Sequence, residues 1–277
     1  MQKNKLKKII IGLIAVAFLV FVVIGLHNPL SISKISLNSD KIDKPINIAL
    51  VSDLHSCKYG EKQCELINAI SNSNPDIICL TGDIFDDRRS NDNAEIFISE
   101  ISAQYPCYYV TGNHEFWANE KEFNSEMAML EKYGVCRLES ESKEICINEQ
   151  TINIIGVDDP ESGSFDLSSA RNANKEYYSI LLSHRPEYLG DYSLTGVDLV
   201  LCGHAHGGQW RIPGILENGL IAPNQGLFPK YTNGIYTTKD TTMIVSRGLA
   251  KESTIVPRFY NKPEVVIIEV LDSYLRG

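Results

Sequence analysis

Three features are scarce or missing in this chain of 277 residues. None of its seven cysteines forms a Cys-x-x-Cys pair, which argues against a zinc ribbon or a dithiol redox centre. Positive charge is scarce after the N-terminus: the whole chain carries a formal −9, and because residues 1–8 contribute +4, the rest carries −13. An acidic body argues against binding of phosphate backbones, so we expect no nucleic-acid partner. No internal repeat or low-complexity tract occurs, and the length suits one large α/β domain or two small ones.

A long apolar run lies near the N-terminus. Residues 9–26 are uncharged and follow four lysines, and eighteen apolar residues just suffice to cross a bilayer as a helix. A cleaved signal peptide has a similar layout, but its apolar part is usually shorter and no Ala-x-Ala site follows, so we favour an uncleaved anchor. The lysines should stay cytoplasmic. We therefore expect a membrane-anchored protein with a cytoplasmic tail (1–8), a transmembrane helix (9–26), a linker (27–44) and an extracytoplasmic catalytic domain (45–277).

From residue 46 onward, short apolar runs alternate with helical patterns. Each run that we interpret as a strand ends just before a polar motif, which is where α/β proteins gather their sites. Helices are expected near residues 61–71 and 94–102. The expected strands and the motifs after them are 46–51 before Asp53, 77–80 before Gly82-Asp83, 107–110 before Gly112-Asn113-His114, 178–182 before His184 and 198–202 before His204.

Three further runs complete the expected α/β fold. Residues 151–157 are expected to form one more strand, and residues 241–246 and 264–270 are β-rich and are expected to close a second sheet. Within the linker, residues 35–37 could already form an edge strand. The segment 212–233 is rich in Gly, Pro and Asn, and it is interpreted either as a lid or wall of the site or as a plain connection.

Five of the six histidines fall inside the motifs, together with carboxylates and one amide. Imidazole is the commonest protein ligand for zinc, iron and manganese, so the chain is predicted to be a metalloenzyme. Two divalent ions about 3.5–4 Å apart need a shared ligand, and Asp83, which follows a strand and a glycine, is the natural bridging carboxylate. Asp53 and His55 alternate along one segment, as do His204 and His206, so each pair is expected to point one way from an extended strand.

Taken in order, these motifs resemble those of the calcineurin-like metallophosphoesterases. The resemblance covers residues 46–270, and the block Gly-His-Ala-His-Gly-Gly-Gln at 203–209 resembles a bacterial membrane-associated phosphohydrolase subgroup. It implies a four-layer α/β/β/α sandwich that holds two divalent ions, and mixed nitrogen and oxygen ligation suits manganese, iron or zinc. The implied ligands are Asp53, His55, Asp83 and His206 for one ion, and Asp83, Asn113, His184 and His204 for the other.

The resemblance also implies a reaction. A phosphodiester, phosphomonoester or pyrophosphate would be hydrolysed by direct attack of metal-bridging hydroxide. His114 would protonate the leaving oxygen or stabilise its charge, and Asp86, the fourth residue of Asp83-Ile84-Phe85-Asp86, would orient His114. Arg247 is the arginine that we expect to bind substrate phosphate, and the membrane segment favours a lipid-linked or envelope substrate.

Two other functions remain open from the sequence. The chain could be a membrane-anchored scaffold that has kept the fold and lost catalysis, although it lacks none of the ligands. It could also be a nuclease of the same fold, although such an enzyme favours a basic groove. Phe116 and Trp117 either line a substrate wall or pack in the core.

Overall fold

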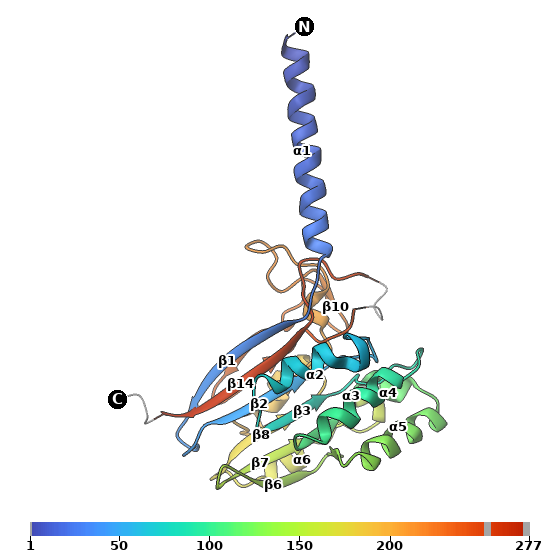
Figure 1. Cartoon of the computed structure of the whole chain (residues 1–277). Coiled ribbons are helices and arrows are strands. Elements are labelled where there is room, and N and C mark those ends of the chain that lie inside the picture. The colour runs from blue at the N-terminus through green and yellow to red at the C-terminus, as the bar shows by residue number, and fades with distance from the viewer. Residues whose placement is uncertain (1, 252–255, 274–277) are drawn as a thin grey trace.

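Three apolar runs form the parallel centre of a first six-stranded sheet in the computed structural model, which describes residues 2–251 and 256–273 (Figure 1). β2 (Ile46–Val51), β3 (Ile77–Thr81) and β4 (Cys107–Val110) pair in parallel, and nearly all of their residues are buried. Apolar runs of this kind are typical of strands that are covered on both faces. The strand order is β1 (Ser31–Ser39), β14 (Glu264–Asp272), β2, β3, β4 and β5 (Cys136–Arg137).

A second six-stranded sheet packs against the first. Its parallel centre consists of β7 (Gln150–Gly156), β8 (Tyr178–Leu182) and β9 (Leu199–Cys202). Side chains from the facing strands of the two sheets form one apolar cluster, for example Leu50 and Ile77 with Ile180 and Leu201. Burial of each such side chain contributes about 1.5–3 kcal/mol. The order of the sheet is β12 (Gly234–Thr238), β13 (Thr241–Val245), β9, β8, β7 and β6 (Ser142–Ile147).

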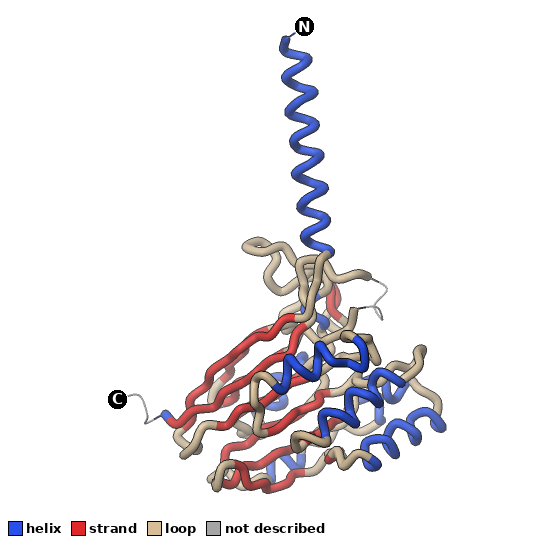
Figure 2. The backbone as a smooth tube through the Cα atoms, in the orientation of Figure 1, coloured by secondary structure: helices blue, strands red, loops and turns tan. Residues whose placement is uncertain are grey.

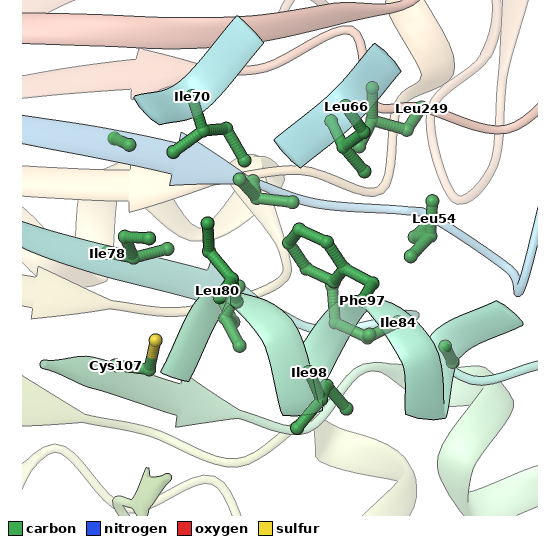
Figure 3. Close-up of a cluster of buried hydrophobic side chains, with 14 of the residues drawn as sticks. Leu54, Leu66, Ile70, Ile78, Leu80, Ile84, Phe97, Ile98, Cys107 and Leu249 are labelled. Atoms are coloured by element: carbon green, nitrogen blue, oxygen red, sulfur yellow. The ribbon is translucent and has the colours of Figure 1, made fainter. Parts of the chain in front are cut away.

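Helices cover the outer face of each sheet (Figure 2). On the first sheet, α2 (Cys64–Ser71), α3 (Asp92–Ser102) and α5 (Glu120–Lys132) contribute apolar side chains to one cluster with the strands, and Figure 3 shows Leu66 and Phe97 near Leu80 of β3. On the second sheet, α6 (Ser168–Asn172) and α7 (Leu189–Ser193) do the same. The predicted four-layer α/β/β/α sandwich is therefore confirmed.

The other elements are short and lie in the connecting segments. Several of them follow the motifs and help to place the candidate ligands. They are η1 (Glu61–Gln63), α4 (Asn113–Trp117), η2 (Pro160–Ser162), η3 (Pro186–Tyr188), η4 (His206–Gly208) and the hairpin of β10 (Ile221–Ala222) and β11 (Gly226–Leu227).

One sequence-based expectation about the sheets is wrong, and another, the edge strand in the linker, is confirmed but too short. Residues 264–270, expected in the second sheet, belong to β14, which lies between β1 and β2 in the first. The predicted linker 27–44 contains the nine-residue strand β1, longer than the edge strand expected at 35–37. β1 pairs with β14, from Ser31 opposite Glu264 to Ser39 opposite Asp272. This pairing joins segments that are more than two hundred residues apart, so no local sequence pattern predicts it.

The N-terminal helix α1 (Gln2–Leu26) stands away from the sandwich (Figure 1). Its stretch Lys3–Leu26 is long and apolar enough to cross a membrane, with a mean hydropathy of 3.3, and only 6% of that apolar window is buried against the protein. Twenty-five residues span about 37 Å at 1.5 Å per residue. An exposed apolar helix at this end suggests a membrane anchor or a signal sequence.

Candidate metal centre

The candidate ligands lie in loops at the carboxyl ends of parallel strands in both sheets. Asp53 and His55 follow β2, Asp83 follows β3, and Asn113 begins α4 after β4. From the second sheet, His184 follows β8, and His204 and His206 follow β9. The structure brings six of these seven residues, all but Asn113, into two groups whose ligand atoms lie within 4.8 Å of one another: Asp53, His55 and His206 in the first, and Asp83, His184 and His204 in the second. A third group of the same kind joins His55 to Asp86 and His114.

Asp83 lies between the two groups. Its Oδ2 atom is 3.1 Å from His184 Nε2 and 3.6 Å from His55 Nε2. Its Oδ1 atom accepts a hydrogen bond from the backbone N–H of His114 at 2.9 Å, which fixes the carboxylate. Asp53 is held in a similar way, since it accepts the backbone N–H of His204 at 3.0 Å. One oxygen of Asp83 is therefore positioned to serve both groups.

The backbone does not place the ligands as the sequence suggested. The expected alternation along extended strands is wrong, because Asp53, His55, His204 and His206 have φ values of 52°, 46°, 68° and 46°, in the left-handed region. Asp83 also has a positive φ, 53°. This conformation is uncommon outside glycine and costs of the order of 1–3 kcal/mol per residue. Tight loops, rather than strand periodicity, turn the side chains toward a common centre.

Close backbone approach explains the glycine before His204. A Cβ atom on Gly203 would lie 1.8 Å from Ser52 Oγ and 2.4 Å from Asp53 Oδ2. The loop after β9 can thus approach the loop after β2 only because residue 203 has no side chain.

Glu115 is a supporting residue to which the sequence pattern assigned no role. Its buried carboxylate accepts four backbone N–H groups: those of Asp83, Ile84 and Phe85 after β3, and that of Gly112 after β4. Burial and the nearby Asp83 raise the pKa of Glu115 to about 7, although the hydrogen bonds from these N–H groups oppose the shift. The signal available in the sequence was a glutamate that directly follows the Asn-His pair.

Buried polar atoms test whether these residues fit metal ions. Among the residues that the structure describes, both ring nitrogens of His55, Asp83 Oδ2, Asn113 Oδ1 and His206 Nδ1 are buried and make no hydrogen bond. Asp83 Oδ2 and the two His55 nitrogens have only ion-pair contacts, at 3.1 to 3.6 Å, and a buried polar atom without a hydrogen bond costs about 1–3 kcal/mol. Carboxylate and amide oxygens and the unprotonated nitrogen of each imidazole carry lone pairs of the kind that bind zinc, iron or manganese. The donor set fits divalent cations.

The two histidines of the second group are oriented by hydrogen bonds on their far side. His184 Nδ1 lies 2.7 Å from the Thr81 carbonyl oxygen, to which it donates, so Nε2 faces Asp83. His204 Nε2 contacts Asn224 Oδ1 at 2.8 Å, so Nδ1 faces His184 at 3.1 Å. Partners of this kind fix the tautomer and the ring orientation of metal-ligating histidines.

The ionisable side chains of the second group, Asp83, His184 and His204, strongly shift one another's pKa values. Burial opposes ionisation of His184, but the carboxylate of Asp83 raises the pKa of His184 to about 10. Burial likewise opposes ionisation of Asp83, yet the His184 ring holds the pKa of that carboxyl well below its usual range. Burial and the same ring lower the pKa of His204 well below its usual value. His184 and Asp83 thus stabilise each other's charged forms, and a divalent cation bound to Asp83 would take the place of the proton on His184 Nε2.

The partner predicted for His114 is wrong. His114 Nδ1 lies 2.6 Å from Asp87 Oδ1, whereas Asp86 Oδ2 lies 3.3 Å from His55 Nδ1. The Asp86 carboxylate accepts the backbone N–H of Arg88 at 3.0 Å and lies against His55, whereas the carboxylate of Asp87 reaches His114. Spacing in the sequence could not distinguish two adjacent aspartates.

The arginine predicted to bind substrate is also engaged elsewhere. The guanidinium of Arg247 donates to Glu264 at 2.6 Å, and its Cγ atom packs where a Cβ on Gly207 would lie. The structure therefore gives Arg247 a role in supporting the loop of His206. Arg185 is buried, donates to both oxygens of Asp159, and contacts His204 Nε2 at 3.2 Å.

Two segments form walls beside the cluster. Trp117 is 51% exposed and packs on the ring of His114, with the ring centroids 4.6 Å apart, so it does not belong to the core. Within the segment 212–233, the backbone N–H of Leu220 donates to Gly208, and Asn224 reaches His204. This segment forms one wall of the centre.

Comparison with known proteins gives a consistent result. Residues 46–208 match the family model of the calcineurin-like phosphoesterases. The uncharacterized metallophosphoesterase YkoQ of Bacillus subtilis (strain 168) is 26% identical over 93% of this chain and 98% of its own length. The uncharacterized metallophosphoesterase YkuE of the same strain is 30% identical over 79% of this chain and 77% of its own length. Among solved structures, Haemophilus influenzae NAD nucleotidase (NadN) aligns with a TM-score of 0.52 at 16% identity, over 75% of this chain and 46% of that one, which is a likeness of fold.

Proposed function

Because the chain belongs to the calcineurin-like phosphoesterase family and is therefore a metal-binding phosphohydrolase, we propose that it holds two divalent ions and hydrolyses a phosphate ester or anhydride. The position of Asp83 between two groups of buried candidate ligand atoms carries this proposal. Asp53, His55, Asp83 and His206 would hold one ion. Asp83, Asn113, His184 and His204 would hold the other.

The residues present define what bound metals would contribute. Two divalent ions supply Lewis-acid chemistry, in which they polarise phosphoryl oxygens, neutralise developing charge and activate water for in-line attack. Mixed imidazole, carboxylate and amide ligation without cysteine suits manganese, iron or zinc. Direct attack by water requires no nucleophilic side chain, and we assign none.

His114 is the residue that we assign to the leaving group. Its Nδ1–H donates to Asp87, and in the doubly protonated ring Nε2 carries a second proton, which it would donate to the leaving oxygen and transfer to it as the ester bond breaks. Packing against Trp117 on one side and His55 on the other fixes the plane of the ring. Asp87 acts as the positioning residue, in place of the Asp86 that the sequence suggested.

We further propose a location and a substrate class. The lysines at the start of α1 would remain in the cytoplasm and the catalytic domain would lie outside. The substrate would be a phosphodiester, a phosphomonoester or a pyrophosphate that is carried on a lipid or belongs to the cell envelope. The anchor next to the metal centre supports this substrate class.

The proposal is tested on the full chain, purified in detergent without added metal. We expect two metal equivalents per chain, together with hydrolysis that is lost on chelation and restored by manganese, iron or zinc. Substrates to be compared are p-nitrophenyl phosphate, bis-p-nitrophenyl phosphate, nucleotide pyrophosphates and lipid phosphates. Asp83→Asn should lose both metals and activity, because both groups share that carboxylate. Retention of two equivalents by Asp83→Asn would rule out the bridging role, and absence of hydrolysis with every metal would favour a scaffold.

A further inference from the structure

The lower end of α1 is built into the body of the protein. The ring of Phe21 packs against Phe259 and Tyr260, with centroids 5.4 and 5.0 Å apart. Tyr260 also donates from its hydroxyl to the Phe21 carbonyl at 3.0 Å and from its backbone N–H to the Gly25 carbonyl at 2.7 Å. A Cβ atom at Gly25 would lie 2.3 Å from the Phe259 ring, so the helix approaches that ring closely. The helix and the body meet over a defined contact.

This contact sets the height of the body relative to a bilayer. Phe21 lies five residues before the end of α1 at Leu26, which is about 7.5 Å along a helix. If the apolar part of α1 crosses the hydrocarbon core, Phe21 lies within that core. The aromatic residues that touch it, Phe259 and Tyr260, then lie at the depth where aromatic side chains gather in membrane proteins.

Further apolar side chains are exposed on the segment next to this contact. Trp210 is 44% exposed, and its ring lies 5.9 Å from that of Phe259, to which it is also joined by an isolated β-bridge. Ile215, Leu227 and Phe228 are 81%, 66% and 70% exposed. In the view of Figure 1, β10, which pairs with β11, lies below the lower end of α1. Large exposed apolar groups that gather in this way mark a binding surface.

We propose that Trp210, Ile215, Leu227 and Phe228, together with Phe259 and Tyr260, form an interfacial face that inserts into the headgroup layer of the bilayer crossed by α1. The face is continuous with α1 through the Trp210, Phe259 and Phe21 contacts, which favours the bilayer over a second protein as its occupant. Tryptophan and tyrosine suit this layer because they combine an apolar ring with a polar hydrogen-bonding group.

The same segment reaches the metal centre. The hairpin pairs Ile221 with Leu227, and Asn224 in its turn contacts His204. Leu227 is three residues from Asn224, at most about 10 Å along the chain. The interfacial face would therefore hold the metal centre close to the lipid headgroups, where a phosphate on a lipid lies. This consequence for the substrate rests on the proposed function, whereas the membrane contact itself does not.

The two tryptophans of the chain allow a direct test. The full chain is placed in lipid nanodiscs that contain phospholipids brominated in their acyl chains, which quench nearby indoles. In Trp117→Phe, the remaining Trp210 should lose about half of its fluorescence relative to unbrominated discs, because its ring lies at the interface. In Trp210→Phe, the remaining Trp117, which lies on His114, should be nearly unaffected. Absence of quenching of Trp210 would overturn the proposal.

Charged substitutions test the face itself. In the Trp117→Phe background, Leu227→Asp with Phe228→Asp should abolish most of the Trp210 quenching. Leu194→Asp is the matched control, since Leu194 is 68% exposed at the end of α7, away from the face. Because Leu194, Leu227 and Phe228 are all exposed, we expect the substituted chains to fold, and circular dichroism checks this. Equal quenching of Trp210 in both variants would contradict the proposal. A second result would also contradict it: in discs that hold two chains, Trp210 is shielded from water but is not quenched by the brominated lipid. A second copy of the chain would then cover the face. Hydrolysis is measured separately, so failure of the proposed function and failure of the membrane contact give different results.

Discussion

At the scale of single residues, the centre depends on side chains held in unfavourable backbone conformations. Asp53, His55, Asp83, His204 and His206 all have positive φ. The surrounding hydrogen bonds and glycines maintain these conformations, for example Gly203 against Ser52. Strain of this kind collects at functional sites because the geometry that binds a ligand differs from the geometry that the chain prefers.

His114 can be separated from the metal ligands by its effect on turnover. His114→Ala should lower kcat by about 10²–10⁴-fold, the usual contribution of general acid–base catalysis. Its metal content should remain near normal, because its ring is assigned to the leaving group. Steady-state kinetics together with metal analysis check both. Asp87→Asn should lower kcat less than His114→Ala does, and an unchanged rate in His114→Ala would remove its assigned role.

At the scale of elements, one carboxylate ties the loop after β3 to the start of α4. Glu115→Ala would leave four backbone N–H groups without their acceptor. We expect the free energy of unfolding to fall by about 2–4 kcal/mol, and metal content to fall with it because the loop carries Asp83. Glu122→Ala, on an exposed position of α5, is the control. Denaturant titration of both variants gives the comparison, and equal stability would show that the hydrogen bonds contribute little.

A second element-scale prediction concerns α5 and pH. Burial, reinforced by Glu115 and Glu122, raises the pKa of Glu126 to about 9. A carboxyl whose pKa is raised on folding binds protons more tightly in the folded state, so it costs stability above its ordinary pKa of 4.5 and nothing well below it. Glu126→Gln should therefore stabilise the protein at pH 8 by about 1–3 kcal/mol and have little effect at pH 4. Thermal unfolding at both pH values, with exposed Glu131→Gln as control, tests this. If Glu126→Gln raised the stability equally at pH 4 and pH 8, the raised pKa of Glu126 would not be the cause.

At the scale of the whole molecule, the centre joins the two sheets. Asp53 and Asp83 come from the first sheet, and His184 and His204 come from the second. Ions that bind the folded chain should stabilise it by about 2.7 kcal/mol at a hundred times their dissociation constant. Chelation should therefore lower the unfolding temperature, and added manganese, iron or zinc should restore it. Calorimetry on the Asp83→Asn variant, which should not respond to metal, is the control. A wild-type unfolding temperature that is insensitive to chelation would contradict binding between the sheets.

Much of the fold was predictable because its signals are local. Apolar runs such as those of β3 and β9 form strands wherever both faces are covered, and the residues after them lie at one edge of the sheets. The approximate position of every candidate ligand follows from this rule. Asp86 and Asp87 show where the rule ends, since only the folded loop decides that Asp86 contacts His55 and Asp87 contacts His114.

The amino-acid sequence by itself thus determined the metallophosphoesterase motifs, the layered fold and the apolar N-terminal helix, because each is carried by residues close together in the chain. The tertiary structure decided the sheet to which β14 belongs, the pairing of β1, the ion pair of Arg247 with Glu264 and the contact between α1 and Phe259. The strand pairings and the α1 contact join residues that are more than two hundred positions apart. The ion pair of Arg247 depends on which acidic side chain the fold places beside it. Long-range packing, which no local pattern encodes, selects among them.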